Sequence, residues 1–302
     1  MTLIISVLTD QYVALVSDRR ITWSEGGKTK RQEDSDIKTF NLYGQFIMGF
    51  TGLARIDGLR MEAWVSKVLD GIPAHDYFNV LREEIDAAFH RLRHAGKIPD
   101  AFPHAFLAAG YAALTPGGRV YPLSIAISNS VDREGHLPTE TVSSSFKIYL
   151  DPLGNRHHAI YSAGYRMHDT TKQALEHRIR VVTKGDASNP HLTVMPLVTA
   201  LRDTARRSSE HVGRSALFTS LPRCAVPAPG VTAGLAARKG VDFRNQAASI
   251  YLPEDARSTD SSAFYAPACI SPQMHLLGLR VYNGGPVPPL GVEEGYEGWF
   301  NR

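Results

Sequence analysis

The sequence contains few cysteines, no long apolar run and little excess charge of either sign. Its two cysteines, Cys224 and Cys269, belong to no C-x-x-C pair, so we expect two reduced thiols and neither a disulfide framework nor a zinc ribbon. No run of about 18 apolar residues is present, so no membrane-spanning helix is expected. The 33 basic and 30 acidic residues leave a net charge of +3, which gives no reason to expect a nucleic-acid partner.

A secretory signal is also lacking. The first residues have neither the basic segment nor the long apolar core that such a signal requires, and we therefore expect a cytoplasmic protein. The length of 302 residues is enough for one large globular domain or for two modest ones.

Two apolar segments stand at the beginning of the sequence, and the first starts at the third residue. Residues 3–8 and 12–16 are apolar at nearly every position, and the polar residues 9–11 separate them, which predicts a β-hairpin. Because both faces of these strands are apolar, we expect them to be buried on both sides, between two layers. The first residues of most chains are frayed, but here Thr2 should lie at the edge of the core.

The residues around this hairpin resemble a known family. Thr2 precedes the first strand, Asp18 follows sixteen residues later in the sequence Asp-Arg-Arg-Ile-Thr, and Lys38 precedes a strand that ends in Gly49-Phe-Thr-Gly. This pattern resembles the proteasome β-subunit and its bacterial relative, the heat-shock peptidase HslV, over about residues 2–222. The segment between Asp18 and Lys38 is a few residues longer than in typical members.

The resemblance implies an N-terminal nucleophile hydrolase in which removal of Met1 exposes Thr2. The Thr2 hydroxyl would be the nucleophile, and its free α-amine, with an ordinary pKa of about 7.7–8.0, would be the base. Lys38, cationic at its ordinary pKa of about 10.4, would lower the proton affinity of both groups. Asp18 would hold Lys38, and the Gly49 N–H would face the developing oxyanion.

Residues 159–165 carry a weaker match. They resemble the family's Gly-Ser-Gly segment, and Ser162 falls at the position of a serine that hydrogen-bonds near the threonine amine. Tyr161 and Ala163 replace the flanking glycines. A serine that only packs at the end of a strand is an equally good interpretation.

The segment after the last predicted helix departs from the family pattern. Catalytic members have an aspartate and a serine there at D-x-x-S spacing. Ser215 matches the serine, but the aspartate position falls on Val212. Glu210 is a candidate substitute. This departure is the main sequence argument against full catalytic competence.

The remaining pattern predicts an α+β fold. Apolar residues recur at helical spacing over about 56–71, 77–94, 167–181 and 194–211, and strands are predicted at 104–111, 120–127, 146–150 and 159–165. Strand pairs, two helices and further strands follow one another in the same order in proteasome subunits. We therefore expect a four-layer αββα sandwich, in which two sheets face each other and helices cover the outside.

The resemblance ends near Pro222. We assign residues 1–222 to the proteasome-like domain and residues 223–302 to a C-terminal extension, in which strands are predicted at 248–252 and 274–282. From about residue 283 proline and glycine predict an extended arm. Its aromatic residues are costly to expose, so we expect the arm to dock on its own domain or on a neighbouring subunit.

The resemblance thus implies a threonine-dependent amide (peptide) hydrolase that acts without cofactor or metal and forms a homo-oligomer. An ATPase partner is not specified. His90 and His94 stand one helical turn apart, but the glutamate of a metallopeptidase helix is lacking, so we expect a solvated basic face. Two alternatives stay open: a catalytically silent assembly subunit, favoured by the departures at Ser162 and Val212 and by the long C-terminal extension, and a small-molecule amidase.

Overall fold

The computed structural model describes most of the first 223 residues and short strands beyond them. The described ranges are 2–25, 28–33, 37–42, 45–113, 120–130, 142–186, 188–208, 211–223, 248–255, 263–265, 268–271, 274–276 and 280–282.

Two seven-stranded sheets form the centre of the molecule. The first has the order β12-β1-β2-β13-β14-β15-β18, and the second has the order β11-β10-β9-β6-β5-β16-β17. The first sheet contains β1 (Leu3–Thr9), β2 (Tyr12–Asp18), β12 (His158–Gly164), β13 (Ala216–Pro222), β14 (Ala248–Leu252), β15 (Ala263–Tyr265) and β18 (Arg280–Tyr282). The second contains β5 (Thr39–Leu42), β6 (Phe46–Thr51), β9 (Ala105–Ala113), β10 (Val120–Ser128), β11 (Lys147–Pro152), β16 (Ala268–Ser271) and β17 (Met274–Leu276).

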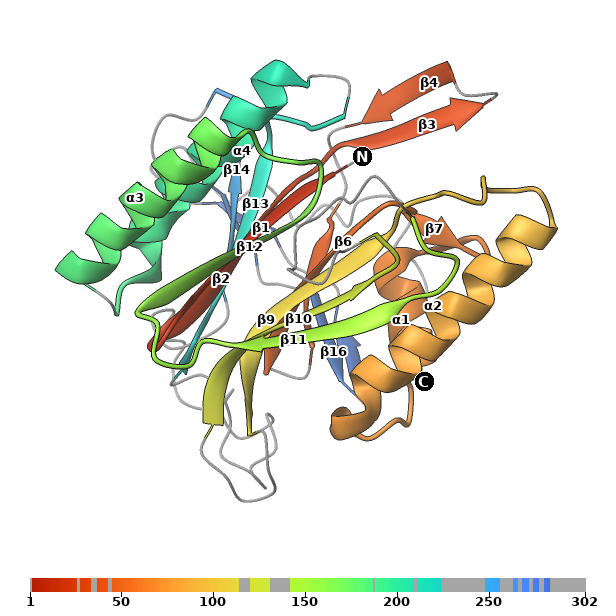
Figure 1. Cartoon of the computed structure of the whole chain (residues 1–302), viewed down its shortest axis with the longest axis horizontal. Helices are drawn as coiled ribbons and strands as arrows, with labels where there is room; N and C mark the ends of the chain where they lie inside the picture. The colour runs from red at the N-terminus through yellow and green to blue at the C-terminus, as the bar shows by residue number, and fades with distance from the viewer. Residues whose placement is uncertain are drawn as a thin grey trace.

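Two pairs of helices cover the outer faces of the sheets (Figure 1). Helices α1 (Met61–Val68) and α2 (Tyr77–His94) pack on the second sheet, and α3 (Asp169–Gly185) and α4 (Val194–Arg207) pack on the first. Short 3-10 helices at Ala74–Asp76 and Pro190–Thr193 precede α2 and α4. No helix in the described ranges is both long enough and apolar enough to cross a bilayer.

Three apolar cores correspond to the three interfaces between the four layers. One lies between the second sheet and α1 and α2, one between the first sheet and α3 and α4, and the third between the sheets. Leu3, Ile5 and Val7 face the helices, whereas Ile4 and Leu8 face the other sheet. The predicted αββα sandwich is therefore confirmed, with the N-terminal hairpin at its centre.

The residues between Asp18 and Lys38 form a separate two-stranded hairpin. It consists of β3 (Ile21–Glu25) and β4 (Lys28–Glu33), and it projects from the end of the sandwich at which β1 begins (Figure 1). The greater length of this segment is thus accommodated outside the sheets. Asp18 and Lys38 therefore both lie beside the start of β1, despite the longer segment between them.

The helix predicted from Ile56 begins five residues later, at Met61. Residues 55–60 form a small hairpin of β7 (Arg55–Ile56) and β8 (Leu59–Arg60). Asp57 and Gly58 connect them with φ values of 52° and 81°, the backbone geometry that favours Asp-Gly in a two-residue hairpin turn. The apolar spacing fitted a helix, but this turn dipeptide decided the local structure.

The C-terminal segments extend both sheets. The strand predicted at 248–252 is confirmed as β14, which pairs with β13. The single strand predicted at 274–282 is wrong in part, because β17 joins the second sheet and β18 joins the first. The strands β15 and β16 were not predicted. The predicted arm from residue 283 lies outside the described residues.

Candidate active site

Thr2 is held at the end of the sandwich by the residue that follows β12 in its own sheet and by the last residue of β6 in the facing sheet. Its carbonyl accepts a hydrogen bond from the Tyr165 N–H at 2.8 Å. The Thr51 hydroxyl lies 3.4 Å from the Thr2 nitrogen and 3.3 Å from the Thr2 carbonyl oxygen. Only 5% of Thr2 is exposed, so the residue next to the N-terminus is fixed in the core, as predicted.

A glycine makes this close packing possible. Gly164 has a φ of 90°, and a Cβ atom at this position would lie 1.9 Å from the Thr2 carbonyl oxygen. Any other residue would therefore push the start of β1 away from β12. Gly164, the last residue of β12, is thus required for the position of Thr2.

Lys38 reaches the Thr2 side chain directly. Its Nζ donates to Thr2 Oγ1 at 2.6 Å and to Asp18 Oδ1 at 3.4 Å, and it also donates to the Arg20 carbonyl. Lys38 is 2% exposed and Asp18 is fully buried. A cation therefore lies in hydrogen-bond contact with the hydroxyl in a site of low dielectric constant, where its field is strong.

Asp18 is the electrostatic anchor of the site. Its Oδ1 accepts the Leu3 N–H at 3.2 Å, and its Oδ2 accepts the Arg20 N–H at 3.2 Å and the Gly213 N–H at 3.0 Å. Burial raises the pKa of Asp18, whereas Lys38 and the three backbone donors lower it. The carboxylate thus links the start of β1, the end of β2 and the loop before β13.

Gly49, the predicted oxyanion donor, lies within the second sheet. Gly49 is in the middle of β6, paired with Thr39 and Leu107, and a Cβ there would meet Ile4 and Leu15 at 3.2 to 3.3 Å. The small residue is therefore needed for the contact between the sheets. Its backbone lies between two paired strands, β5 and β9.

Gly52 follows the residue whose hydroxyl contacts Thr2. It directly follows Thr51, the last residue of β6, and has a φ of 102°. Its N–H has no acceptor among the described residues, whereas the β6 amides belong to the ladder. The sequence contained a signal, because the Gly-Phe-Thr-Gly motif has one glycine inside a buried strand and one just beyond it.

Ser162 is likewise displaced from its predicted position. It lies in β12 opposite Ile5, so it is three residues along β1 from Thr2. The β12 segment reaches Thr2 through Gly164 and Tyr165 instead. Tyr165 stacks on His211, with a distance of 5.6 Å between the ring centroids.

The segment after α4 contacts Asp18 through a backbone N–H. Val212, at the predicted aspartate position, is fully buried in the core next to α3 and α4. Gly213, its neighbour, is the residue that contacts Asp18. Ser215 is buried, and Glu210 lies outside the described residues.

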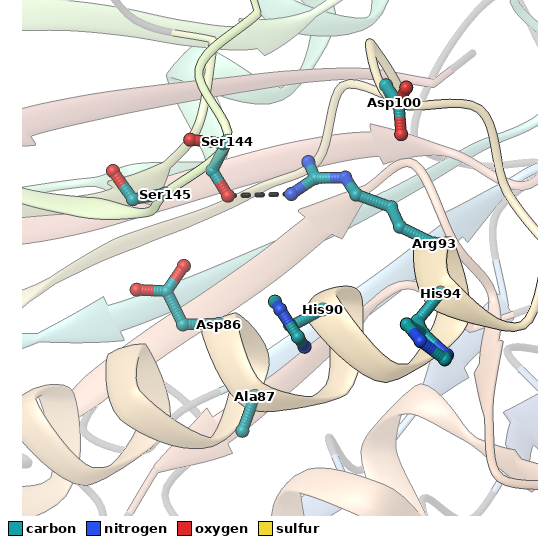
Figure 2. Close-up of a pocket in the computed structure, with 8 residues that line it drawn as sticks. All are labelled: Asp86, Ala87, His90, Arg93, His94, Asp100, Ser144 and Ser145. Carbon is teal, nitrogen blue, oxygen red and sulfur yellow. Dashed lines mark hydrogen bonds between the residues drawn. The ribbon is translucent and has the colours of Figure 1, made fainter.

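A surface pocket in the described part of the chain is separate from this site (Figure 2). It has a volume of about 620 Å³ and lies between α2 and the segment before β11. Its lining residues are Asp86, Ala87, His90, Arg93, His94, Asp100, Ser144 and Ser145. Both predicted histidines are exposed here, and no group of three or more His, Cys, Asp and Glu side chains in the described ranges could hold a metal.

No protein-family model and no curated protein matches the chain. BPH from Thiobacillus denitrificans, solved in complex with epoxomicin, is 12% identical with a TM-score of 0.41, and the match covers 75% of this chain and 100% of that chain. A Gly-1 mutant of Anbu from Hyphomicrobium sp. strain MC1 is 13% identical with a TM-score of 0.39, covering 72% of this chain and 82% of that chain. Both have the proteasome-like N-terminal nucleophile hydrolase fold. The similarity is one of fold alone.

Proposed function

We propose that the protein is an amide hydrolase whose nucleophile is the Thr2 hydroxyl, exposed with a free α-amine when Met1 is removed. The observation that supports the proposal most directly is the 2.6 Å contact between Lys38 Nζ and Thr2 Oγ1. A buried lysine that donates to a threonine hydroxyl, with a buried aspartate 3.4 Å from its Nζ, stabilises the negative charge that develops on that oxygen.

In the proposed reaction the Thr2 α-amine accepts the hydroxyl proton as the oxygen attacks the amide carbon. The Gly52 N–H would donate to the resulting oxyanion. The amine then passes the proton to the leaving nitrogen, and the acyl group remains on Thr2 as an ester. A water molecule, deprotonated by the same amine, cleaves the ester and restores the site. Lys38 and Asp18 keep their charges throughout.

The proposed substrate is an amide bond in a peptide, as the family resemblance of the sequence implies. The same resemblance leads us to propose a homo-oligomer, and we propose a cytoplasmic location on the sequence features given above. BPH was solved with epoxomicin, so this compound is a suitable first probe. A small amide is the alternative substrate, and the two classes are separated by comparing peptide libraries with single amino-acid amides.

The first test is the intact mass and N-terminal sequence of the purified native protein. Loss of Met1 is expected. The processed protein should hydrolyse fluorogenic peptide amides and gain the mass of one epoxomicin molecule per chain. Retention or acetylation of Met1 would remove the proposed base and favour the catalytically silent assembly role.

Three variants complete this test. Thr2→Ala should lose activity by at least about 10³-fold and should no longer form the adduct, while its circular dichroism spectrum and melting temperature stay close to those of the parent. Thr2→Ser keeps a hydroxyl next to the amine and should retain part of the activity. A fully active Thr2→Ala protein would overturn the proposal.

A further inference from the structure

His104 lies immediately behind the turn that carries Gly52. It is 1% exposed, directly precedes β9, and its Nδ1 accepts the Leu53 N–H at 3.2 Å. A Cβ built on Gly52 would lie 2.7 Å from this same nitrogen and 2.6 Å from the Pro103 carbonyl oxygen. The turn and the imidazole are therefore in direct contact, with no space for a side chain between them.

One residue, Thr51, connects this turn with Thr2. Thr51 precedes Gly52, and its hydroxyl lies 3.4 Å from the Thr2 nitrogen and 3.3 Å from the Thr2 carbonyl oxygen. A shift of the turn away from His104 would therefore move Thr51 relative to Thr2. It would also move the Gly52 N–H relative to a bound carbonyl.

His104 is itself held firmly. Its backbone N–H donates to Asn129 Oδ1 at 2.8 Å, its carbonyl accepts the Asn129 N–H at 3.3 Å, and Asn129 Nδ2 donates to the Phe102 carbonyl at 2.9 Å. The ring packs against Phe106 and Phe89, with centroid distances of 4.9 and 5.4 Å. Such support on both backbone and ring is what a residue needs in order to fix the position of another segment.

We infer that His104 is a positioning residue for the proposed reaction, and that its neutral imidazole holds the Thr51 to Leu53 turn against Thr2 through the Leu53 N–H. The inference rests on the proposed function, because it concerns the efficiency of that reaction. Nδ1 accepts only when it carries no proton, so the proton of the neutral ring is on Nε2.

The surroundings of the imidazole keep it neutral. Burial lowers the pKa of His104 to about 3. The rings of Phe89, Phe106 and Phe146 face it. The charged groups on the elements packed around it contact these phenylalanines instead: Arg93 stacks on the Phe89 ring, and Asp86 accepts the Phe146 N–H.

A matched pair of substitutions tests the inference. Asparagine places an acceptor, Oδ1, the same number of bonds from the backbone as Nδ1, whereas leucine places a methyl group there. His104→Leu should lower kcat by about 10- to 100-fold, the loss expected from a displacement of about 1 Å or a misplaced oxyanion donor. KM should change by less than about threefold. The kcat of His104→Asn should be at least about tenfold higher than that of His104→Leu.

Stability and local order are measured in parallel. Ile179, fully buried under the first sheet on α3, supplies the control: Ile179→Ala should lower the melting temperature at least as much as His104→Leu, with kcat unchanged. Hydrogen exchange of the Leu53 amide should be faster in His104→Leu than in the parent, and protected again in His104→Asn.

These measurements distinguish a failure of the proposed function from a failure of the inference about His104. If the parent has no amidase activity, the proposed function fails, and the exchange rates alone report whether His104 holds the turn. If the parent is active but both His104 variants keep its kcat, or if Leu53 exchange is equal in all three proteins, the inference is overturned. If neither variant folds, Leu53 exchange in the unmodified protein decides: loss of protection only on global unfolding supports the anchoring, and exchange as fast as in an exposed turn contradicts it.

Discussion

Lys38 and Asp18 form an ion pair, 3.4 Å from Nζ to Oδ1, at a depth where neither side chain reaches solvent. Taking both charges out of water is costly, and a buried pair compensates for this cost only while both partners and their hydrogen bonds are present. Asp18 has three backbone donors and Lys38 has the Thr2 hydroxyl. The pair is therefore better explained by its position beside Thr2 than by a gain in stability.

This arrangement predicts strong coupling between the two residues. Lys38→Met should destabilise the fold by about 3 to 5 kcal/mol, because it leaves a buried carboxylate without its cation. Lys38→Met combined with Asp18→Asn should cost clearly less than the sum of the two single changes. Urea denaturation of the four proteins gives the coupling free energy. Additive costs would show that the two side chains do not interact. Both lysine variants should be inactive toward peptide amides.

The two glycines of the Gly-Phe-Thr-Gly motif should respond differently to alanine. Gly52→Ala places a Cβ 2.6 Å from a backbone oxygen at a φ of 102°, so we expect a loss of several kcal/mol or failure to fold, and no activity. Gly49→Ala meets only the methyl groups of Ile4 and Leu15 at 3.2 to 3.3 Å. It should cost about 1 to 3 kcal/mol and keep most of its activity. Equal activity losses in soluble, folded proteins would contradict the assignment of Gly52.

The hydroxyl of Thr51 should matter more for the reaction than for the fold. Thr51→Val keeps the shape of the side chain but removes the group that lies 3.4 Å from the Thr2 nitrogen. We expect kcat to fall by about tenfold and stability by about 0.5 to 1.5 kcal/mol, the contribution of one hydrogen bond. Thr51→Ser should restore activity. The comparison needs only steady-state kinetics and thermal melts, and an active valine variant would remove Thr51 from the mechanism.

His104 should make the stability of the protein depend on pH. The folded protein keeps this imidazole neutral down to a pKa of about 3, whereas an unfolded histidine protonates below about 6.5. The unfolded state therefore binds more protons between these values, so stability falls as the pH decreases through 6.5. The loss from this group is about 2 kcal/mol at pH 5 relative to pH 7.5.

The measurement is the difference in unfolding free energy between the parent and His104→Asn, recorded from pH 8 to pH 5. Taking the difference removes the contribution of the carboxylates that titrate in the same range. A difference that does not change with pH would show that His104 is accessible to protons in the folded state.

The sequence predicted the parts of the fold that depend on continuous burial. Strands β1 and β2 are buried at every position, so their apolar composition was sufficient evidence. Helix α2 was predicted with its observed limits, Tyr77 to His94, because its apolar face recurs over five turns. The hairpin at residues 55–60 was missed because Ile56 and Leu59 fit a helical period as well as a strand.

In the candidate site, too, some residues were predicted from the sequence and others were missed. The family resemblance assigned Asp18 by its spacing from Thr2 and Lys38 by its place before the next strand, and the structure brings their side chains together. Gly49 and Ser162 were assigned by motif, but the residues next to Thr2 are fixed by strand register: β12 reaches it at Gly164, and β6 ends beside it at Thr51. Register depends on pairing between distant segments, such as Leu3 with Gly164, which a single sequence does not reveal.

The position of β1 between β2 and β12 also sets an order of events during synthesis. One neighbour of β1 follows within ten residues, but the other consists of residues 158–164, which the ribosome makes only when half the chain has emerged. Until then the threonine end of β1 has an open side. The contacts that enclose Thr2 on this side, with the Tyr165 N–H and the Gly164 backbone, can therefore form only in the second half of synthesis.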